Sequence, residues 1–353
     1  MHAFTYTAHP SRVVFGPGAL GRLGAEIGQL GVQRALVLCT PGQRGLAQRV
    51  SNLLGERAAG VFSQAVMHVP IETARAARAE ARRLGADCAV AIGGGSTTGL
   101  GKAIALESGL PIIAIPTTYA GSEVTPIWGL TEAGVKKTGR DPRVLPRSVI
   151  YDPELTLGLP PGLTVTSLMN AIAHAAEGLY ADDANPVTGL MAEEGIRACA
   201  SALAALAIDP GGIDARSDAL YGAWLCGIVL GSVAMGLHHK LCHTLGGSFN
   251  LPHAELHSVI LPHALAYNGA AAPQAMARIA HALDRAGAAQ GLFDLAARHG
   301  APTSLQAIGM PADGLDRAVE LALSQSYFNP RPLERAALRA LLQRAFDGRP
   351  PAP

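Results

Sequence analysis

The sequence has few charged residues and almost no net charge. Charged side chains make up 16% of the 353 residues, below the roughly 25% of an average soluble chain, whereas 49% are hydrophobic. This composition argues against intrinsic disorder. Lys and Arg together number 28 and Asp and Glu 27, so no net field attracts nucleic acid or an anionic membrane surface. We expect a folded protein without a nucleic-acid partner.

The cysteines also lack the spacing of a metal or redox motif. The chain has five cysteines and no CxxC pair, and each lies in an apolar stretch that is typical of a buried thiol. The N-terminal residues contain no apolar run of the length that a signal peptide needs. These absences predict a protein of the reducing cytoplasm.

One uncharged run, residues 219–237, has nearly the length of a membrane span. Four glycines interrupt this run, and it leads directly into His238, His239 and Lys240 with no second span. We therefore predict a buried core helix here and no membrane segment.

The two halves of the chain differ in pattern. Up to about residue 150, short β-rich runs alternate with helical segments, which is typical of a parallel sheet with crossover helices. The β-rich runs are residues 34–39, 60–66, 88–95 and 111–118, and residues 71–84 are the clearest helical segment. Beyond residue 152 the β-branched runs vanish and helical patterns continue. The sequence thus predicts a Rossmann-like α/β domain at residues 1–152 and an all-helical domain at residues 153–353.

A glycine-rich turn follows the third β-rich run. Its sequence, GGGSTT, precedes a helical run, so backbone N–H groups at the helix N-terminus can receive a phosphate. A second polar turn, residues 116–123, follows the next strand, at the same edge of the predicted sheet. We predict that Gly94, Gly95 and Ser96 bind a dinucleotide, aided by the second turn. A tight turn without a ligand is the alternative.

Histidines concentrate in the second half. His174 lies four residues after Asn170, and His239 and His243 have the same spacing, so the members of each pair share one helix face. His253 follows ten residues later. Three or four converging imidazoles suit a metal ion, or equally an anionic substrate that needs hydrogen-bond donors.

Several segments together resemble the iron-containing, group III alcohol dehydrogenase superfamily. These segments are GGGSTTGLGK, PTTYAGSE, DPEL, NAIAHAAEGLY and HKLCHTLGGSFNLPH. The resemblance covers nearly the whole chain. Within it, GLGKAIAL and PTTYAGSEVTPIWGLTE are most similar to maleylacetate reductases, enzymes of aromatic-ring degradation. The resemblance implies a dinucleotide-binding α/β domain, a helical domain and a homodimer.

The resemblance also implies where a metal would bind. Metal-binding members use one Asp and three His; the His positions fall on His174, His239 and His253, and the Asp position falls on Asn170. An Asn carbonyl supplies a dipole but no charge, so affinity for Fe(II) should fall. Maleylacetate reductases are similar in lacking this Asp, and we therefore expect no metal.

For a maleylacetate reductase, the resemblance implies reduction of the conjugated C=C bond of maleylacetate, and of 2-chloromaleylacetate, to 3-oxoadipate. Negative charge develops on the ketone oxygen as an enolate, so the site needs a donor for that oxygen and an acid for the adjacent carbon. We expect His243 to be the principal donor or acid. NADH is the expected cofactor, and NADPH should be tolerated because Thr40 stands where NAD-specific members often carry Asp.

The expected site residues form three sets, with Lys102 as a secondary candidate. They are, for catalysis, His174, His239, His243 and His253; for the cofactor, Thr40, Gly94, Gly95, Ser96, Thr117, Thr118, Tyr119, Ser122 and Lys137; and for the dicarboxylate substrate, Asn170, His174, His238, His239, His253 and Tyr327.

Two other functions stay open. If Asn170 still binds Fe or Zn, the chain is a metal-dependent, NAD(P)-dependent alcohol dehydrogenase. A non-catalytic nucleotide-binding protein is the second alternative.

Overall fold

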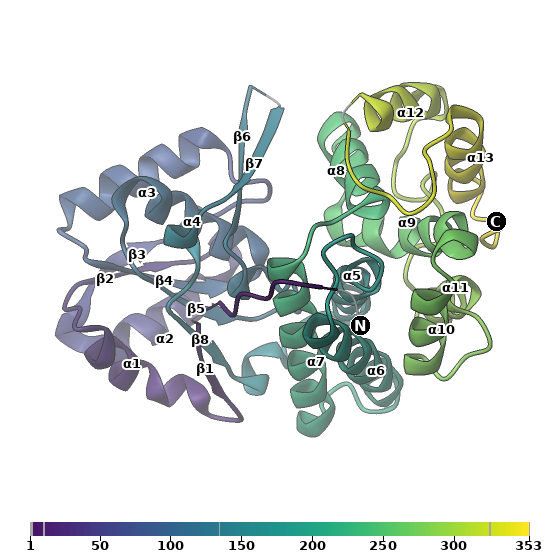
Figure 1. Cartoon of the computed structure of the whole chain (residues 1–353). Coiled ribbons are helices and arrows are strands. Elements are labelled where there is room, and N and C mark those ends of the chain that lie inside the picture. The colour runs from purple at the N-terminus through teal and green to yellow at the C-terminus, as the bar shows by residue number, and fades with distance from the viewer. Residues whose placement is uncertain (1–2, 10, 134, 325, 353) are drawn as a thin grey trace. The chain divides into compact units, whose positions relative to one another are not determined.

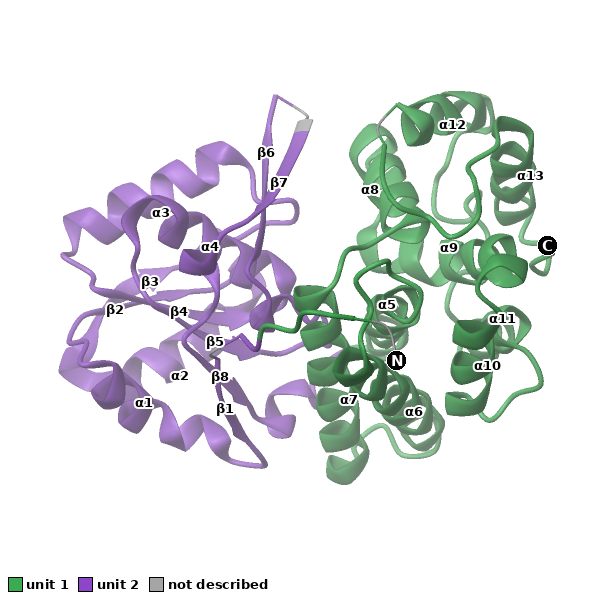
Figure 2. Cartoon of the chain, in the orientation of Figure 1, with its two compact units in different colours: residues 1–7, 160–353 green, residues 8–159 purple. Residues whose placement is uncertain are grey.

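The computed structural model describes residues 3–9, 11–133, 135–324 and 326–352. The chain forms two compact units (Figure 2). One unit is Ala8–Leu159, and the other is Pro160–Pro353 together with the N-terminal segment up to Thr7. The division thus falls after Leu159, whereas the sequence predicts it after residue 152 and assigns the N-terminal segment to the first domain.

The first unit is built on a six-stranded parallel sheet in the order β1-β8-β5-β4-β2-β3 (Figure 1). Its strands are β1 (Arg12–Phe15), β2 (Ala35–Leu38), β3 (Ala58–Phe62), β4 (Cys88–Gly93), β5 (Ile112–Pro116) and β8 (Ser148–Tyr151). Its helices are α1 (Leu23–Leu30), α2 (Arg44–Leu54), α3 (Ile71–Arg83) and α4 (Gly95–Ser108). Alternate residues of β2 face opposite layers: Ala35 and Val37 pack with α1 and α2, and Leu36 and Leu38 with α3 and α4. Helices therefore cover both faces of the sheet.

Most of this unit follows the sequence prediction. The four predicted β-rich runs form β2, β3, β4 and β5, and the predicted helix forms α3. The antiparallel hairpin of β6 (Ile127–Glu132) and β7 (Val135–Arg140) was not predicted, nor were β1 and β8. The predicted fold class, a Rossmann-like parallel-sheet domain joined to a helical domain, is confirmed.

The second unit is helical in its described residues (Figure 1). Its helices are α5 (Pro161–Gly178), α6 (Pro186–Ile208), α7 (Ile213–Ser232), α8 (Leu237–Phe249), α9 (His253–Asn268), α10 (Pro273–Ala282), α11 (Ala288–Arg298), α12 (Leu315–Leu323) and α13 (Arg335–Phe346). Two glycines let α6 and α7 pack closely. A Cβ atom at Gly195 would lie 2.8 Å from the sulfur of Cys226, and one at Gly222 would lie 2.7 Å from the sulfur of Cys199.

The uncharged run at residues 219–237 lies mostly in α7, whose inward face is buried, so the predicted core helix is confirmed. Among the described residues no single helix is long and apolar enough to cross a membrane. The bent pair α7 and α8, which meet at 95°, passes the same test of length and composition together. The predicted burial of the cysteines is also confirmed, because all five are free and buried.

Candidate active site

The predicted glycine-rich turn joins β4 to α4 in the first unit. Gly93 has a φ of 150°, and a Cβ atom there would lie 2.5 Å from Thr97 Oγ1. A Cβ atom at Gly94 would meet the Thr118 side chain at 3.0 Å, whereas at Gly95 the nearest atom is 3.7 Å away. Internal packing therefore requires glycine at position 93 and restricts position 94, but leaves room at the exposed Gly95.

Gln43 links the ends of two strands beside this turn, and sequence analysis missed it. Thr40 Oγ1 donates to Gln43 Oε1 over 3.1 Å, and Gln43 Nε2 donates to Thr117 Oγ1 over 2.9 Å. Thr40 follows β2 and Thr117 follows β5. This bridge holds two of the predicted cofactor residues at the carboxyl edge of the sheet, where open α/β sheets bind ligands.

The remaining predicted cofactor residues lie in different settings. Tyr119 is fully buried after β5, and Ser122 is half-buried and uses its backbone oxygen to accept from Lys102. Lys137 is exposed in the hairpin strand β7 and forms an ion pair with Glu132, with 2.8 Å between Nζ and Oε2.

Lys102 is enclosed within the first unit. Its ammonium donates to the backbone oxygens of Ser122, Thr125 and Ile127 and to Thr125 Oγ1, all within 2.6–2.9 Å. The side chain is 1% exposed, and burial lowers the pKa of Lys102 to about 7, against the opposing effect of Glu123. Because oxygen atoms of residues 122–127 accept the hydrogen bonds of the ammonium group, we assign Lys102 to the scaffold and not to substrate binding.

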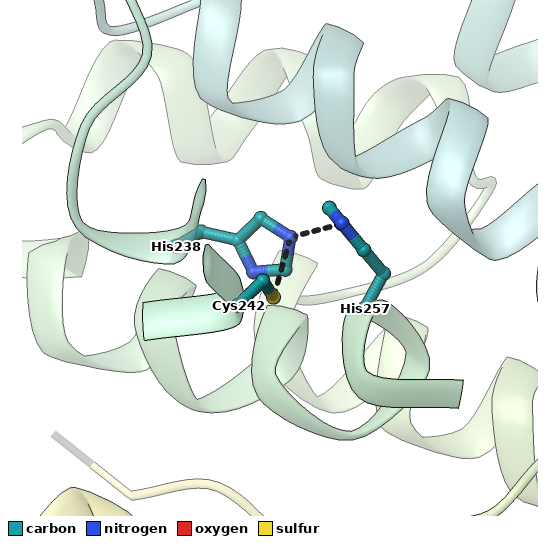
Figure 3. Close-up of side chains that lie close together, drawn as sticks. All are labelled: His238, Cys242 and His257. Carbon is teal, nitrogen blue, oxygen red and sulfur yellow. Dashed lines mark hydrogen bonds between the residues drawn. The ribbon is translucent and has the colours of Figure 1, made fainter. Parts of the chain in front are cut away.

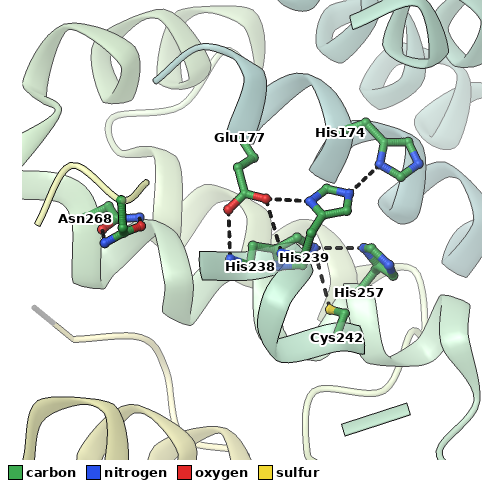
Figure 4. Close-up of polar contacts among 8 residues, drawn as sticks. His174, Glu177, His238, His239, Cys242, His257 and Asn268 are labelled. Carbon is green, nitrogen blue, oxygen red and sulfur yellow. Dashed lines mark hydrogen bonds and ion pairs between the residues drawn. The ribbon is translucent and has the colours of Figure 1, made fainter. Parts of the chain in front are cut away.

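In the second unit, histidines from α5, α8 and α9 converge (Figure 4). This histidine cluster consists of His174, His238, His239, His243, His253 and His257. Neighbouring ring centroids lie 4.5 to 6.5 Å apart. The structure thus brings together all the histidines that the sequence nominates, together with His257, which it did not.

Two hydrogen-bonded pairs form the buried part of the cluster. His174 Nδ1 lies 2.7 Å from His239 Nε2, and His239 Nδ1 lies 2.5 Å from Glu177 Oε2. In the second pair, His238 Nε2 lies 2.8 Å from His257 Nδ1. Burial, and then the neighbouring histidines, hold the pKa values of His238 and His257 well below the ordinary value, so both rings are neutral.

The cluster also has an accessible side. His243 is exposed and His253 is half-buried, and their rings stack at 6.5 Å with an interplanar angle of 13°. Lys240 Nζ lies 5.9 Å from the ring of the half-buried Tyr327. Burial, followed by the charge on Glu177, raises the pKa of Tyr327. A ligand that reaches the cluster would therefore meet His243 and His253 before the buried pairs.

Sequence analysis missed His257, Glu177 and Cys242. Each lies one helical turn from a nominated histidine: His257 follows His253 by four residues, Cys242 follows His238 by four, and Glu177 follows His174 by three. The same spacing rule that identified the first histidines could have found them.

Two groups of buried atoms at the histidine cluster suit a metal ion. The side chain of Asn170 is buried, and its Oδ1 has no hydrogen-bond partner among the described residues. In addition, His238, Cys242 and His257 offer ligand atoms that all lie within 4.8 Å of one another (Figure 3). Imidazole and thiolate are common ligands of first-row transition metals.

Comparison with known proteins identifies the family. Residues 10–153 match the family model described as iron-containing alcohol dehydrogenase. Residues 164–346 match the one described as Fe-containing alcohol dehydrogenase family, C-terminal. The chain belongs to the iron-containing alcohol dehydrogenase family. It is therefore an oxidoreductase.

Within the iron-containing alcohol dehydrogenase family, the chain is similar to proteins named maleylacetate reductase. It is 69% identical over 348 residues to that of Burkholderia cepacia, covering 99% of both chains. It is 59% identical to that of Pseudomonas sp. strain P51, covering 97% of both. The crystal structure of maleylacetate reductase from Agrobacterium tumefaciens has a TM-score of 0.96 at 57% identity, covering 99% of this chain and 100% of that one. The predicted resemblance is confirmed.

The expectation that no metal binds is wrong. Membership of the iron-containing family implies an iron cofactor, and the buried donors described above suit one. The argument from Asn170 failed because loss of one charged ligand lowers metal affinity but leaves the imidazoles, and three imidazoles can hold a divalent ion.

Proposed function

We propose that this chain is a maleylacetate reductase, which uses NADH to reduce the C=C bond of maleylacetate and so forms 3-oxoadipate. The observation that carries the proposal is the 69% identity, over 99% of both chains, to a protein of that name. The exposed His243 beside buried, neutral imidazoles supports it, because an enolate needs a donor that substrate can reach.

The cofactor binds at the carboxyl edge of the parallel sheet. The first turn of α4 has N–H groups without partners in its own helix, and Gly95 is exposed with no neighbour closer than 3.7 Å to a Cβ position. Internal packing does not demand glycine there, which favours a role in close approach to the pyrophosphate. Thr40, Thr117, Thr118 and Ser122 contact the rest of the dinucleotide.

The reaction requires a hydride, a proton and a group that stabilises the negative charge of the enolate. Hydride from the nicotinamide adds to the alkene carbon that is β to the ketone, the C=C electron pair shifts toward the carbonyl, and an enolate forms. His243 donates to the enolate oxygen or delivers the proton to the adjacent carbon. His174, His239, His253 and His238 line the dicarboxylate site with Asn170 and Tyr327. The products are 3-oxoadipate and NAD⁺.

Asn170 Oδ1 and the imidazoles of His174, His239 and His253 would hold the iron ion. When bound there, the ion supplies Lewis acidity toward a carbonyl oxygen. The nitrogen atoms that bind it must carry lone pairs, so the protonation of these rings matters for metal binding as well as for proton transfer.

Three finer properties complete the proposal. NADH is the preferred cofactor and NADPH is tolerated, because Thr40 carries no charge to repel a 2′-phosphate. The enzyme acts in the cytoplasm, where its five free cysteines stay reduced. It forms a homodimer, as the family resemblance implies.

A paired assay tests the function. NADH oxidation is followed with freshly generated maleylacetate, and NAD⁺ reduction is followed with primary and secondary alcohols, each with added Fe(II). The proposal predicts rapid oxidation of NADH and little reduction of NAD⁺. Rapid alcohol oxidation without maleylacetate turnover would favour the metal-dependent alcohol dehydrogenase instead, and inactivity in both arms would favour a non-catalytic nucleotide-binding protein.

A further inference from the structure

Lys240 carries the only formal charge in a long stretch of the second unit. Between Asp218 and Glu255 the sequence contains no other Asp, Glu, Lys or Arg. Lysine is also rare in the whole chain, since Lys240 is the only one that follows Lys137. A single cation therefore lies in an otherwise uncharged stretch that also contains four residues of the histidine cluster.

This lysine lies on the accessible face of α8. Lys240, His243, Thr244 and Gly247 are half-buried or exposed, whereas the residues between them are buried. A spacing of three, four and seven residues places these four on one face of the helix. Lys240 is therefore one helical turn from His243, on the side of the histidine cluster that a ligand meets first.

The ring of Tyr327 holds the ammonium group on this face. Lys240 Nζ lies 5.9 Å from the centre of the ring, a distance at which the face of an aromatic ring attracts a cation. The segment that carries Tyr327 is in turn attached to the end of α9, because Asn329 and the buried Asn268 exchange two hydrogen bonds of 2.8 and 2.9 Å. The ammonium group thus has an anchored neighbour.

The proposed substrate needs a cation that the residues assigned to it above do not include. Maleylacetate has two carboxylates, and a carboxylate that leaves water needs a cation or several N–H donors. Each carboxylate is separated from the ketone by only one or two carbon atoms. Residues three apart on a helix have Cβ atoms about 5–6 Å apart, so a ketone at His243 brings a carboxylate within reach of Lys240. An ammonium group has three N–H donors, so contacts within the chain are compatible with one to a carboxylate.

We propose that Lys240 binds one carboxylate of the substrate and thereby selects anionic substrates over uncharged ones. The proposal rests on the proposed function for the identity of the substrate, and it adds to that function a residue that determines specificity. Lys240 acts on the carboxylate, whereas His243 acts on the ketone. Because Lys240 is half-buried, water and salt screen this ion pair less than they screen one at an exposed position.

The first experiment measures the KM for maleylacetate of Lys240→Met in the full-length enzyme with Fe(II). Methionine keeps the apolar stem and removes the charge, so this KM should rise about tenfold while the KM for NADH stays that of the parent. Lys240→Arg should recover most of the loss, because a guanidinium also pairs with a carboxylate. An unchanged KM for maleylacetate in Lys240→Met would overturn the proposal, whether or not the melting temperature falls. Lys240→Gln serves as a second neutral variant if the methionine variant does not fold.

Arg317→Met is the matched control for the loss of one positive charge. Arg317 is exposed on α12 in the same unit, and its replacement leaves α8 unchanged. The KM for maleylacetate should therefore stay that of the parent. A rise as large as that in Lys240→Met would mean that the net charge of the protein sets this KM, and would refute a contact between Lys240 and the substrate.

A binding measurement separates this proposal from the proposed function. Adipate is a stable dicarboxylate with as many carbon atoms as 3-oxoadipate, and titration calorimetry in the presence of NADH gives its affinity for the parent and for Lys240→Met. We expect the variant to bind adipate about tenfold more weakly. Equal affinities would overturn the carboxylate site. Weaker binding by the variant, in an enzyme that does not reduce maleylacetate, would support the carboxylate site and refute the proposed function.

Discussion

In the first unit, the buried ammonium of Lys102 is enclosed by four oxygen atoms within 2.9 Å. In the second unit, Asn170 Oδ1, His238 Nδ1 and His257 Nε2 are equally buried but have no partner among the described residues. A buried polar atom without a partner costs free energy, so native proteins rarely keep one without a reason. The difference indicates that Lys102 stabilises the first unit, whereas these three atoms of the second unit are available for a ligand.

The largest effect should come from the accessible side of the histidine cluster. Replacing His243 with Ala removes the proposed donor to the enolate, so kcat should fall about a hundredfold or more while NADH affinity and melting temperature stay near those of the parent. His243→Asn should retain part of the rate because it supplies a neutral donor. All three quantities are measured on one preparation, and an undiminished kcat would remove His243 from the mechanism.

Replacement of Lys102 should lower the stability of the fold, whereas replacement of His243 should lower kcat. Lys102→Met leaves buried oxygen atoms without donors, and we expect a loss of about 2 kcal/mol in the free energy of unfolding, measured by urea denaturation. Lys137→Met, at an exposed ion pair, should change that free energy by less than about 1 kcal/mol. A Lys102 variant that keeps its stability but loses maleylacetate turnover would return Lys102 to the candidate site and break the comparison.

Replacement of Gly95 tests whether the first unit also contains a ligand-binding site. Gly95→Val should raise the KM for NADH about tenfold, because a side chain would stand between the α4 N-terminus and the pyrophosphate. Gly24→Val is a matched control, since nothing lies within 4 Å of a Cβ position at Gly24 in α1. Equal KM values in the two folded variants would make the turn merely structural.

The smallest structural change among these variants is the replacement of the Asn170 amide by a carboxylate. Asn170→Asp supplies a charged oxygen in place of an amide oxygen that has no partner among the described residues. Affinity for Fe(II) or Zn(II) should therefore rise, by about tenfold, in equilibrium dialysis followed by elemental analysis. Unaltered affinity would show that this side chain does not reach the metal and would leave its buried oxygen unexplained.

The sequence predicts the parts of the fold that depend on local pattern. The apolar runs of β2, β4 and β5 are buried along their whole length and so read as strands, whereas β1 has exposed ends and the hairpin strand β7 has the sequence VKKTGR. Short or charged strands are stabilised by their partners, and local pattern does not reveal a partner. The antiparallel hairpin was therefore missed.

The same limit applies to the site. Spacing within one helix located Asn170, His174, His239 and His243, but Glu177 on α5 contacts His239 on α8, which is 62 positions away in the sequence. Single-helix spacing cannot show such a contact. The metal expectation failed for a related reason, because it rested on one missing carboxylate and the sequence does not show how many imidazoles converge.

Transfer of deuterium from NADH labelled at C4 of the nicotinamide tests the central claim most directly. The account predicts one deuterium atom on the methylene of 3-oxoadipate beside its distal carboxylate, which is the carbon β to the ketone, and a solvent-derived hydrogen on the neighbouring carbon. NMR of the isolated product locates both. Deuterium on a newly formed carbinol carbon would mean that the enzyme reduces the C=O bond, and would contradict the account.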